Sequence, residues 1–301
     1  MTTRRDAIRL IGSASAAAFF GVARDGVFAG ARARAEAAAP SLAPGDPKSA
    51  ERLALIDAFR RRSLGLERAY EARVHKSDFD MPYRLFRPQG GRQVPLVVYL
   101  HGSGGLGNDN VKQLGLGNTF GTRVWLLPEN QRRFPCFVVA PQTDRGWIRY
   151  DFTTEGEQGR AKEVPGLGDG ARLAFEVIDA LSSEFPIDPR RIYLTRQSMG
   201  GAGTWHMIAQ RKGFFAAAVP CCGSPSPDDA AESAATPVWS FHGIADDTVP
   251  VEVSRDRVAA LRKAGAHPLA TEYPGVGHEV WEWAYTEPEL LPWVFAQRRA
   301  G

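Results

Sequence analysis

A serine, a pair of aspartates and a histidine follow three segments of the chain that have the composition of buried strands. Ser198 comes after RIYLT, Asp246 and Asp247 come after TPVWSF, and His278 comes after PLATEY. A serine hydroxyl is a weak nucleophile until a base removes its proton, and an imidazole titrates near enough to neutral pH to take that proton and return it. A carboxylate on the second ring nitrogen fixes the tautomer and stabilises the imidazolium. These residue types therefore predict hydrolysis through an acylated serine.

Ser198 lies in RIYLTRQSMGGAGTW, where an apolar strand changes directly into a helix. Such a turn holds the serine in a strained backbone conformation that lifts its hydroxyl clear of the sheet, and Gly200 and Gly201 let helix and strand approach closely. The usual pattern has glycine two positions before the serine, where this chain has Arg196. Because an unpaired buried charge costs several kcal/mol, we expect Arg196 to be partly exposed or paired with a carboxylate, beside the site, where it would favour an anionic substrate.

A glycine-rich loop, HGSGGLGNDN, follows the strand-like PLVVYL at residues 95–100. With few side chains in the way, its backbone N–H groups can point at one spot, as an oxyanion hole requires. A dinucleotide site is the competing interpretation, but no acidic residue lies at the distance at which the ribose is bound. We therefore expect no cofactor.

The other five histidines are weaker candidates for a chemical role, and we expect His206, within the predicted helix at 198–213, to be structural. His101 and His242 each begin an HG pair at the end of a predicted strand, where we expect a buried ring hydrogen-bonded to loop backbone. His75 and His267 have no acidic or cysteine partners at the spacing of metal ligands, so we expect no metal site.

Three aromatic residues, Trp147, Trp281 and Tyr285, are candidates to line a substrate pocket, with packing in the core as the alternative. The cysteines are too few for a disulfide framework and fall in apolar strand-like runs, so we expect core residues, with a single bridge left open. They are Cys136, Cys221 and Cys222.

Strand-like and helix-like segments alternate through most of the chain, which predicts an α/β fold: a mostly parallel central sheet with helices on both faces. Two strands around a DFD turn, at residues 70–77 and 81–88, form an antiparallel hairpin at the edge of the sheet. Further strands are expected at 95–100, 134–141, 191–195, 214–220, 236–243 and 268–275, and helices at 49–63, 169–185, 198–213 and 251–265. Reactive residues should lie at the carboxyl ends of the parallel strands, where the loops converge.

The length of 301 residues, of which 44% are hydrophobic, suits one large domain. The net charge of +3 comes from the N-terminus, because outside residues 1–35 the chain has 31 basic and 32 acidic residues. This balance gives no reason to expect nucleic acid or an anionic membrane as a partner.

The first 35 residues have the pattern of an export signal. Arg4 and Arg5 precede a weakly hydrophobic run at residues 11–22, as in twin-arginine signals, and the run is too short to span a bilayer before Arg24. A basic tail is the alternative. We expect residues 1–35 to be the signal peptide, 36–66 a linker with a short amphipathic helix, and 67–301 the catalytic domain. The protein would then be periplasmic or extracellular, exported after folding and without a stable membrane anchor.

Residues 70–301 resemble α/β-hydrolase esterases grouped with the predicted peptidases and related to polyhydroxybutyrate-depolymerase-like and prolyl-oligopeptidase-like enzymes. The resemblance is carried by motifs in the same order as in that family. They are YEAR with PYRLFRP, LHGSGGLGNDN, CFVVAPQ, DPRRIYLTRQSMGGAGTW, FHGIADDTVPVEVSR and YPGVGHEVWEWAYTEPELLPW.

The resemblance implies roles for individual residues. Ser198 would be the nucleophile, His278 the base and Asp246 the acid, because the family's acidic residue lies three positions before the valine of the VP pair. The backbone N–H groups of Met199 and of Ser103 or Gly104 would form the oxyanion hole. The implied activity is that of an exported serine carboxylesterase, without cofactor or metal, acting on a small or polymeric ester.

Two alternatives stay open alongside the esterase. A peptidase or polyester depolymerase would use the same triad, and a catalytically weakened binding protein would result if Arg196 distorts the turn. The sequence gives no indication of the oligomeric state.

Overall fold

The computed structural model describes residues 41–42, 45–90, 92–155, 161–223 and 229–299, with the backbone alone described at 41–42, 149–155 and 161–167. The predicted signal peptide, residues 1–35, and residues 36–40 and 43–44 of the predicted linker lie outside the described residues. None of the helices in the described part of the chain is both long and apolar enough to cross a bilayer.

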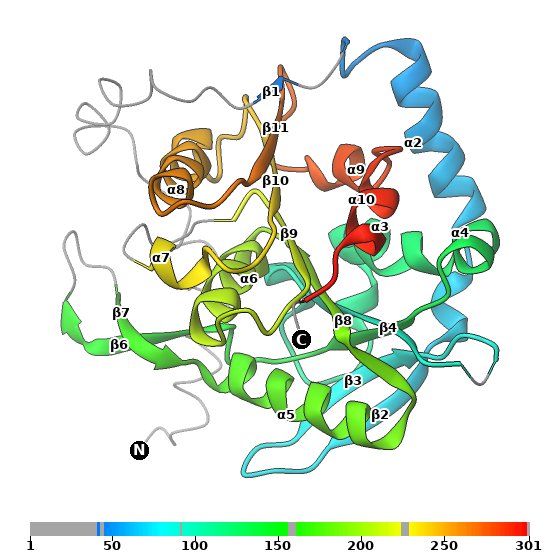
Figure 1. Ribbon diagram of the computed structural model, residues 1–301, viewed down its shortest axis with the longest axis vertical. Helices are drawn as coiled ribbons and strands as arrows, with labels where there is room; N and C mark the ends of the chain where they lie inside the picture. Colours follow the sequence, from blue (N-terminus) through cyan, green and yellow to red (C-terminus); the bar gives the residue numbers. More distant parts are fainter. Residues whose placement is uncertain (1–40, 43–44, 91, 156–160, 224–228, 300–301) are drawn as a thin grey trace, which may run out of the picture.

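A nine-stranded sheet, counted over the described residues, forms the centre of the molecule, in the order β1-β11-β10-β9-β8-β4-β5-β3-β2 (Figure 1). β3 pairs antiparallel with β2 and with β5, and the other neighbours are parallel. The predicted fold class, with its antiparallel hairpin at one edge, is confirmed. The strands are β1 (Ser41–Leu42), β2 (Glu71–His75), β3 (Met81–Phe86), β4 (Val94–Leu100), β5 (Phe137–Pro141), β8 (Ile187–Gln197), β9 (Ala217–Cys221), β10 (Trp239–Gly243) and β11 (Leu269–Tyr273).

Helices cover both faces of the sheet (Figure 1). One hydrophobic cluster joins the sheet to α5, α6 and α8, and the other joins it to α2, α3, α9 and α10. The helices are α2 (Ala50–Arg62), α3 (Thr119–Arg123), α4 (Pro128–Arg133), α5 (Asp169–Glu184), α6 (Met199–Gln210), α7 (Ala230–Ser233), α8 (Val251–Lys263), α9 (Trp281–Ala284) and α10 (Leu290–Ala296).

The central strand β4 shows why its sequence is apolar without interruption. Leu96 and Val98 pack into one cluster, whereas Val97 and Tyr99 pack into the other, because successive side chains of a strand point to opposite faces. A strand covered on both faces by helices has no position for a solvated side chain.

The expected N-terminal helix is present as α2. The Ser49 hydroxyl caps it by accepting a hydrogen bond from the Arg52 N–H at 3.3 Å, and Phe59 stacks on Phe120 with ring centroids 4.5 Å apart. Leu53, one turn before the buried Ile56, is 41% exposed. The helical spacing of apolar residues predicted the helix, but it did not show how many of these residues are buried.

Two strand pairings were not expected from the sequence. β1 lies within the predicted linker and pairs with β11 at the edge of the sheet. A separate antiparallel pair, β6 (Ile148–Glu155) and β7 (Ala161–Leu167), precedes α5. The cysteine prediction is confirmed, since Cys136, Cys221 and Cys222 are buried and free.

Candidate active site

Ser198 lies on a sharp turn between the end of β8 at Gln197 and the start of α6 at Met199. Its backbone has φ 52° and ψ −129°, a combination that residues with a side chain rarely adopt. The N–H of Ser198 donates to the Cys221 carbonyl of β9 at 3.0 Å, so the turn is tied to the neighbouring strand. Gly201 is needed here because a methyl group on it would lie 2.7 Å from the same carbonyl oxygen.

The structure brings Ser198, His278 and Asp246 together from three separate loops. The Ser198 Oγ lies 2.9 Å from Nε2 of His278, and Nδ1 of His278 lies 2.8 Å from Oδ2 of Asp246. Asp247, the competing carboxylate, is exposed and accepts a hydrogen bond from the Thr248 hydroxyl at 3.4 Å. Among the two aspartates, therefore, Asp246 is the one in contact with the imidazole.

The loop after β10 holds Asp246 with its side chain fully buried. The backbone N–H groups of Thr248 and Val249 donate to Oδ1 at 2.9 and 2.8 Å, and Nε2 of His242 lies 3.3 Å from Oδ2. Burial alone would raise the pKa of Asp246, but the hydrogen bonds from His242, His278 and Val249 outweigh it and hold the pKa well below its ordinary value. Asp246 is therefore ionised at neutral pH.

Asp246 in turn orients His278. With the carboxylate accepting at Nδ1, that nitrogen carries the proton and Nε2 is free to accept from the Ser198 hydroxyl. Burial alone would lower the pKa of His278, but the hydrogen bond and charge of Asp246, together with the thiol of Cys222, raise it. Trp281 packs edge-on against the imidazole, with ring centroids 5.5 Å apart, and restricts its rotation.

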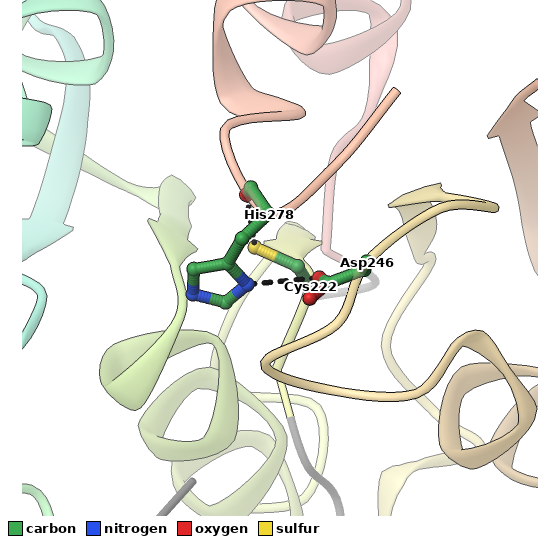
Figure 2. A group of neighbouring side chains, drawn as sticks. All are labelled: Cys222, Asp246 and His278. Atoms are coloured by element: carbon green, nitrogen blue, oxygen red, sulfur yellow. Dashed lines mark hydrogen bonds and ion pairs between the residues drawn. The ribbon is translucent and has the colours of Figure 1, made fainter. Parts of the chain in front are cut away.

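Cys222 lies directly behind this pair, as Figure 2 shows. Its backbone has a positive φ of 41°, and its thiol donates to the His278 carbonyl at 3.4 Å. Burial is the main reason that the pKa of the thiol is raised, so the sulfur is protonated at neutral pH. Within the described residues, Cys222, Asp246 and His278 form a group that could hold a metal ion, with ligand atoms within 4.8 Å of one another. A metal there would displace the hydrogen bond between His278 and Asp246.

The glycine-rich loop follows β4 and forms a short 3-10 helix at Ser103–Gly105. In the described part of the chain, the N–H groups of Met199, Ser103 and Gly104 donate to no backbone carbonyl, so they are available to an anionic oxygen. The Asn118 side chain fixes the loop by accepting from the Gly102 N–H at 3.0 Å. The three N–H groups lie on two backbone segments, the turn after β8 and the loop after β4.

His101 and His242 have the structural contacts expected of them. The His101 ring accepts from the Thr143 N–H at 3.0 Å through Nε2, so Nδ1 carries the proton and donates to the Gly102 carbonyl at 2.8 Å. Burial, with the nearby charge of Arg196, lowers the pKa of His101 to about 3, and the ring is neutral. His242 donates from Nε2 to the Val249 carbonyl at 2.9 Å, and its contact with Asp246 is a supporting role that the sequence did not indicate.

Two of the three aromatic candidates for a substrate pocket are core residues. Trp147 is 1% exposed and donates from its indole N–H to the His101 carbonyl, and Tyr285 is 1% exposed with its hydroxyl bonded to Thr195. Both rings fill space beneath the site, where apolar side chains are excluded from water, and the prediction for them is wrong. Trp281 alone lies against the triad histidine.

The expectation for Arg196 is also wrong. Its side chain is fully buried, and no carboxylate of the described residues forms an ion pair with it. The reason is steric: Gly200, in the first turn of α6, leaves room for the guanidinium inside the molecule, so the side chain does not need to leave along a surface groove.

A loop that the sequence did not single out connects the turn to the surface. The Gln197 side chain donates to the Gly117 carbonyl at 2.5 Å, and a methyl group on Gly117 would lie 3.1 Å from the Trp281 ring. Leu116, next to it, has a positive φ of 49° and is 74% exposed, with its Cδ1 3.4 Å from the position of a methyl group on Gly104. The sequence gives no signal for Leu116, because its positive φ and its position beside Gly104 depend on the folded backbone.

Known proteins share this arrangement of strand, turn and loops. Residues 168–283, which include all three triad residues, match the dienelactone hydrolase family. The chain has the α/β-hydrolase fold. The predicted resemblance to the esterases and peptidases of this fold is confirmed.

Three relatives illustrate the likeness. The crystal structure of a thermostable esterase is 34% identical, with a TM-score of 0.69, over 78% of this chain and 64% of that one. A probable SOBER1-like carboxylesterase of Arabidopsis thaliana is 26% identical over 69% of this chain and 80% of its own length. A bifunctional acetylxylan esterase/xylanase of Neocallimastix patriciarum is 34% identical over 87 residues, 29% of this chain.

The chain spans only part of two of these relatives. It covers 13% of the Neocallimastix patriciarum protein and 64% of the thermostable esterase.

Proposed function

We propose that this α/β-hydrolase is a serine carboxylesterase with Ser198 as its nucleophile. The observation that carries the proposal is the continuous hydrogen-bonded chain from the Ser198 hydroxyl through His278 to Asp246, with distances of 2.9 and 2.8 Å. Each distance lies within the range in which a proton can be transferred or a ring held.

In the proposed reaction, Ser198 Oγ attacks the ester carbonyl carbon while its proton passes to Nε2 of His278. The electron pair of the carbonyl moves to its oxygen, which the N–H groups of Met199 and of Ser103 or Gly104 stabilise. The tetrahedral intermediate expels the alcohol, which takes the proton from His278, and an acyl-enzyme remains. A water molecule, deprotonated by the same imidazole, then releases the acid and restores Ser198.

We propose an esterase rather than a peptidase because the relatives with the higher sequence identity are esterases. The thermostable esterase is 34% identical, and the SOBER1-like carboxylesterase is matched over most of both chains. No observation in the described residues favours the peptidase, the polyester depolymerase or the weakened binding protein.

The activity can be tested with the purified protein and p-nitrophenyl acetate. Ser198→Ala and His278→Ala should each lower kcat on the order of 10³-fold or more, leaving the contribution of the oxyanion donors. A fluorophosphonate should phosphonylate the Ser198 oxygen with release of fluoride, a mass increase of the reagent less HF, in the wild type and not in Ser198→Ala. Hydrolysis that survives in Ser198→Ala would show that another group is the nucleophile, and no hydrolysis of any ester by the wild type would favour the binding protein.

We further propose export to the periplasm or beyond, based on Arg4 and Arg5 ahead of the apolar run at residues 11–22. Replacing both arginines with lysine should leave a precursor in the cytoplasm. A mature protein in the periplasm at the wild-type yield, or one with its N-terminus intact, would contradict this proposal.

A further inference from the structure

Among the described residues, Arg196 is a buried cation without a carboxylate partner, at the turn that carries Ser198. Its side chain has no exposed surface, and its Nη2 donates to the carbonyl of Gln197. Nε and Nη1 are buried and have no hydrogen-bond partner among the described residues. An uncompensated buried charge is destabilising, and an apolar side chain of similar volume would fill the same space at less cost. Its presence here therefore calls for an explanation other than stability.

The guanidinium lies between the two backbone segments that carry the proposed oxyanion donors. On one side, a methyl group on Gly200 would lie 2.2 Å from Nε, so the group rests directly on the first turn of α6, just after Met199. On the other side, a methyl group on Gly102 would lie 3.5 Å from Nη2, so the group also rests on the loop that leads to Ser103. The register of the sheet agrees, since Arg196 pairs with Leu100 at the end of β4.

The surroundings keep the side chain in place and charged. Its guanidinium carbon lies 5.7 Å from the centre of the Tyr99 ring, a distance at which a cation is attracted to the aromatic face. Burial lowers the pKa of Arg196 to about 10, which leaves it protonated at neutral pH. The same charge is one cause of the lowered pKa of His101, which shows that its field reaches the oxyanion loop.

A fixed positive charge in this position acts on the two states of the reaction differently. The ester carbonyl carries no net charge before attack, whereas its oxygen gains a full negative charge when Ser198 Oγ bonds to the carbonyl carbon. In a water-excluded interior, attraction to that charge is much stronger than in water, and only interactions stronger in the transition state raise kcat. Since the guanidinium is buried, it does not touch the substrate.

We propose that Arg196 is a positioning residue that places a buried positive charge beneath the oxyanion hole and so favours the tetrahedral intermediate. This inference rests on the proposed esterase function, and it assigns a role to the residue that replaces the usual glycine. It excludes the role expected from the sequence, in which the arginine would bind an anionic group of the substrate directly.

The test compares neutral and charged replacements of Arg196 with p-nitrophenyl acetate. Arg196→Met and Arg196→Gln should lower kcat on the order of 10- to 100-fold with little change in KM, as expected for a charge lost near the developing oxyanion. Arg196→Lys should recover most of the loss. Arg257→Met, which removes an equally buried arginine from α8, should keep the wild-type kcat and serves as the control.

A second measurement separates charge from structure. Phenylboronic acid forms a tetrahedral, negatively charged adduct on a nucleophilic serine, so its inhibition constant should rise in parallel with the loss of kcat in the Met and Gln variants. Wild-type kcat in both neutral variants, or a loss in Arg196→Lys as deep as in Arg196→Met, would overturn the inference. If the wild-type protein hydrolyses no ester, the proposed function fails instead, and the two failures are thus distinguishable.

Discussion

Arg196 and Arg257 are both fully buried, but the structure compensates their charges in different ways. Arg257, in α8, forms an ion pair with Asp229, donates to the Ser233 hydroxyl at 2.6 Å and lies 5.1 Å from the Trp205 ring. Arg196, at the carboxyl end of β8, has a carbonyl and an aromatic ring instead of a carboxylate. The charge of Arg257 links α8 to the start of α7. The charge of Arg196, by contrast, can interact with the negative charge that we propose forms on the substrate during the reaction.

This difference indicates a division between two regions of the molecule. Charged groups at the carboxyl ends of β8, β10 and β11 should control rate, and charged groups between α7 and α8 should control stability. Variants in each region can sharpen or break that division.

The largest expected effect belongs to the carboxylate of the triad. Asp246→Asn leaves the shape of the side chain but allows its amide to face Nδ1, which favours the wrong tautomer of His278, so kcat should fall on the order of 10³- to 10⁴-fold. Asp247→Asn, the matched control on the same loop, should stay near the wild type. Equal losses in the two variants would contradict the assignment of Asp246.

The same variant has a consequence for the pH dependence. His278 acts as a base only when it is neutral, so kcat/KM should rise with pH as the imidazole loses its proton. Asp246 raises the pKa of His278, and its replacement by asparagine removes that cause. The acidic limb of the pH profile of kcat/KM should therefore move to lower pH in Asp246→Asn. A limb that stays in place would show that another group controls it.

The second effect concerns the paired arginine. Asp229→Ala removes the carboxylate that pairs with the buried Arg257, and because Asp229 is itself 27% exposed, the free energy of unfolding should fall by about 1–3 kcal/mol. Urea denaturation measures this loss, and kcat should be unchanged. Asp256→Ala, which removes an exposed carboxylate from the same helix, should change the free energy of unfolding by less than about 0.5 kcal/mol. A loss of kcat in Asp229→Ala would break the division.

The third effect has the opposite sign. Arg196→Met removes an uncompensated buried charge, so the free energy of unfolding should rise by about 1–3 kcal/mol. Denaturation in urea, measured beside the kinetic experiment, would then show a more stable and slower enzyme. Equal destabilisation by Arg196→Met and Arg257→Met would mean that the two arginines are compensated alike.

The smallest effect compares two leucines that are each 74% exposed, Leu116 beside Gly104 and Leu64 after α2. A methylene group withdrawn from water contributes about 0.8 kcal/mol, so loss of apolar contact at Leu116 should be felt by longer acyl chains. Leu116→Ala should lower the ratio of kcat/KM for p-nitrophenyl hexanoate over acetate by about fourfold or more. Leu64→Ala should leave that ratio unchanged, and a similar change in both variants would show that Leu116 has no special contact with substrate.

Much of the fold follows from local sequence patterns. The parallel strands of the central sheet are continuous apolar runs bounded by turn residues, and their alternation with helices restricts the topology to few arrangements. For the same reason Ser198, His278 and the aspartate pair could be placed at one edge of the sheet before the structure was known. The choice of Asp246 over Asp247 required the family resemblance, since both residues follow β10 and only the folded loop buries one of them.

The remaining features depend on contacts that sequence patterns do not encode. Trp147 and Tyr285 are aromatic, as the residues that line substrate pockets often are, but an aromatic side chain near a site is equally suited to the core beneath it. The burial of Arg196 depends on the space left by Gly200, which lies four residues later on the other side of the turn at Ser198. β1 has two residues, too few for any periodicity.

The backbone of Ser198 has a consequence for how this enzyme can change over evolutionary time. A φ of 52° is favourable for glycine and strained for serine, so the substitution Ser198→Gly would relieve local strain while removing the proposed nucleophile. A mutation from serine to glycine at this position would thus stabilise the fold but lower fitness through the loss of activity. Only continued selection for turnover keeps the serine, and a lineage released from that selection would lose activity here without any loss of solubility or fold.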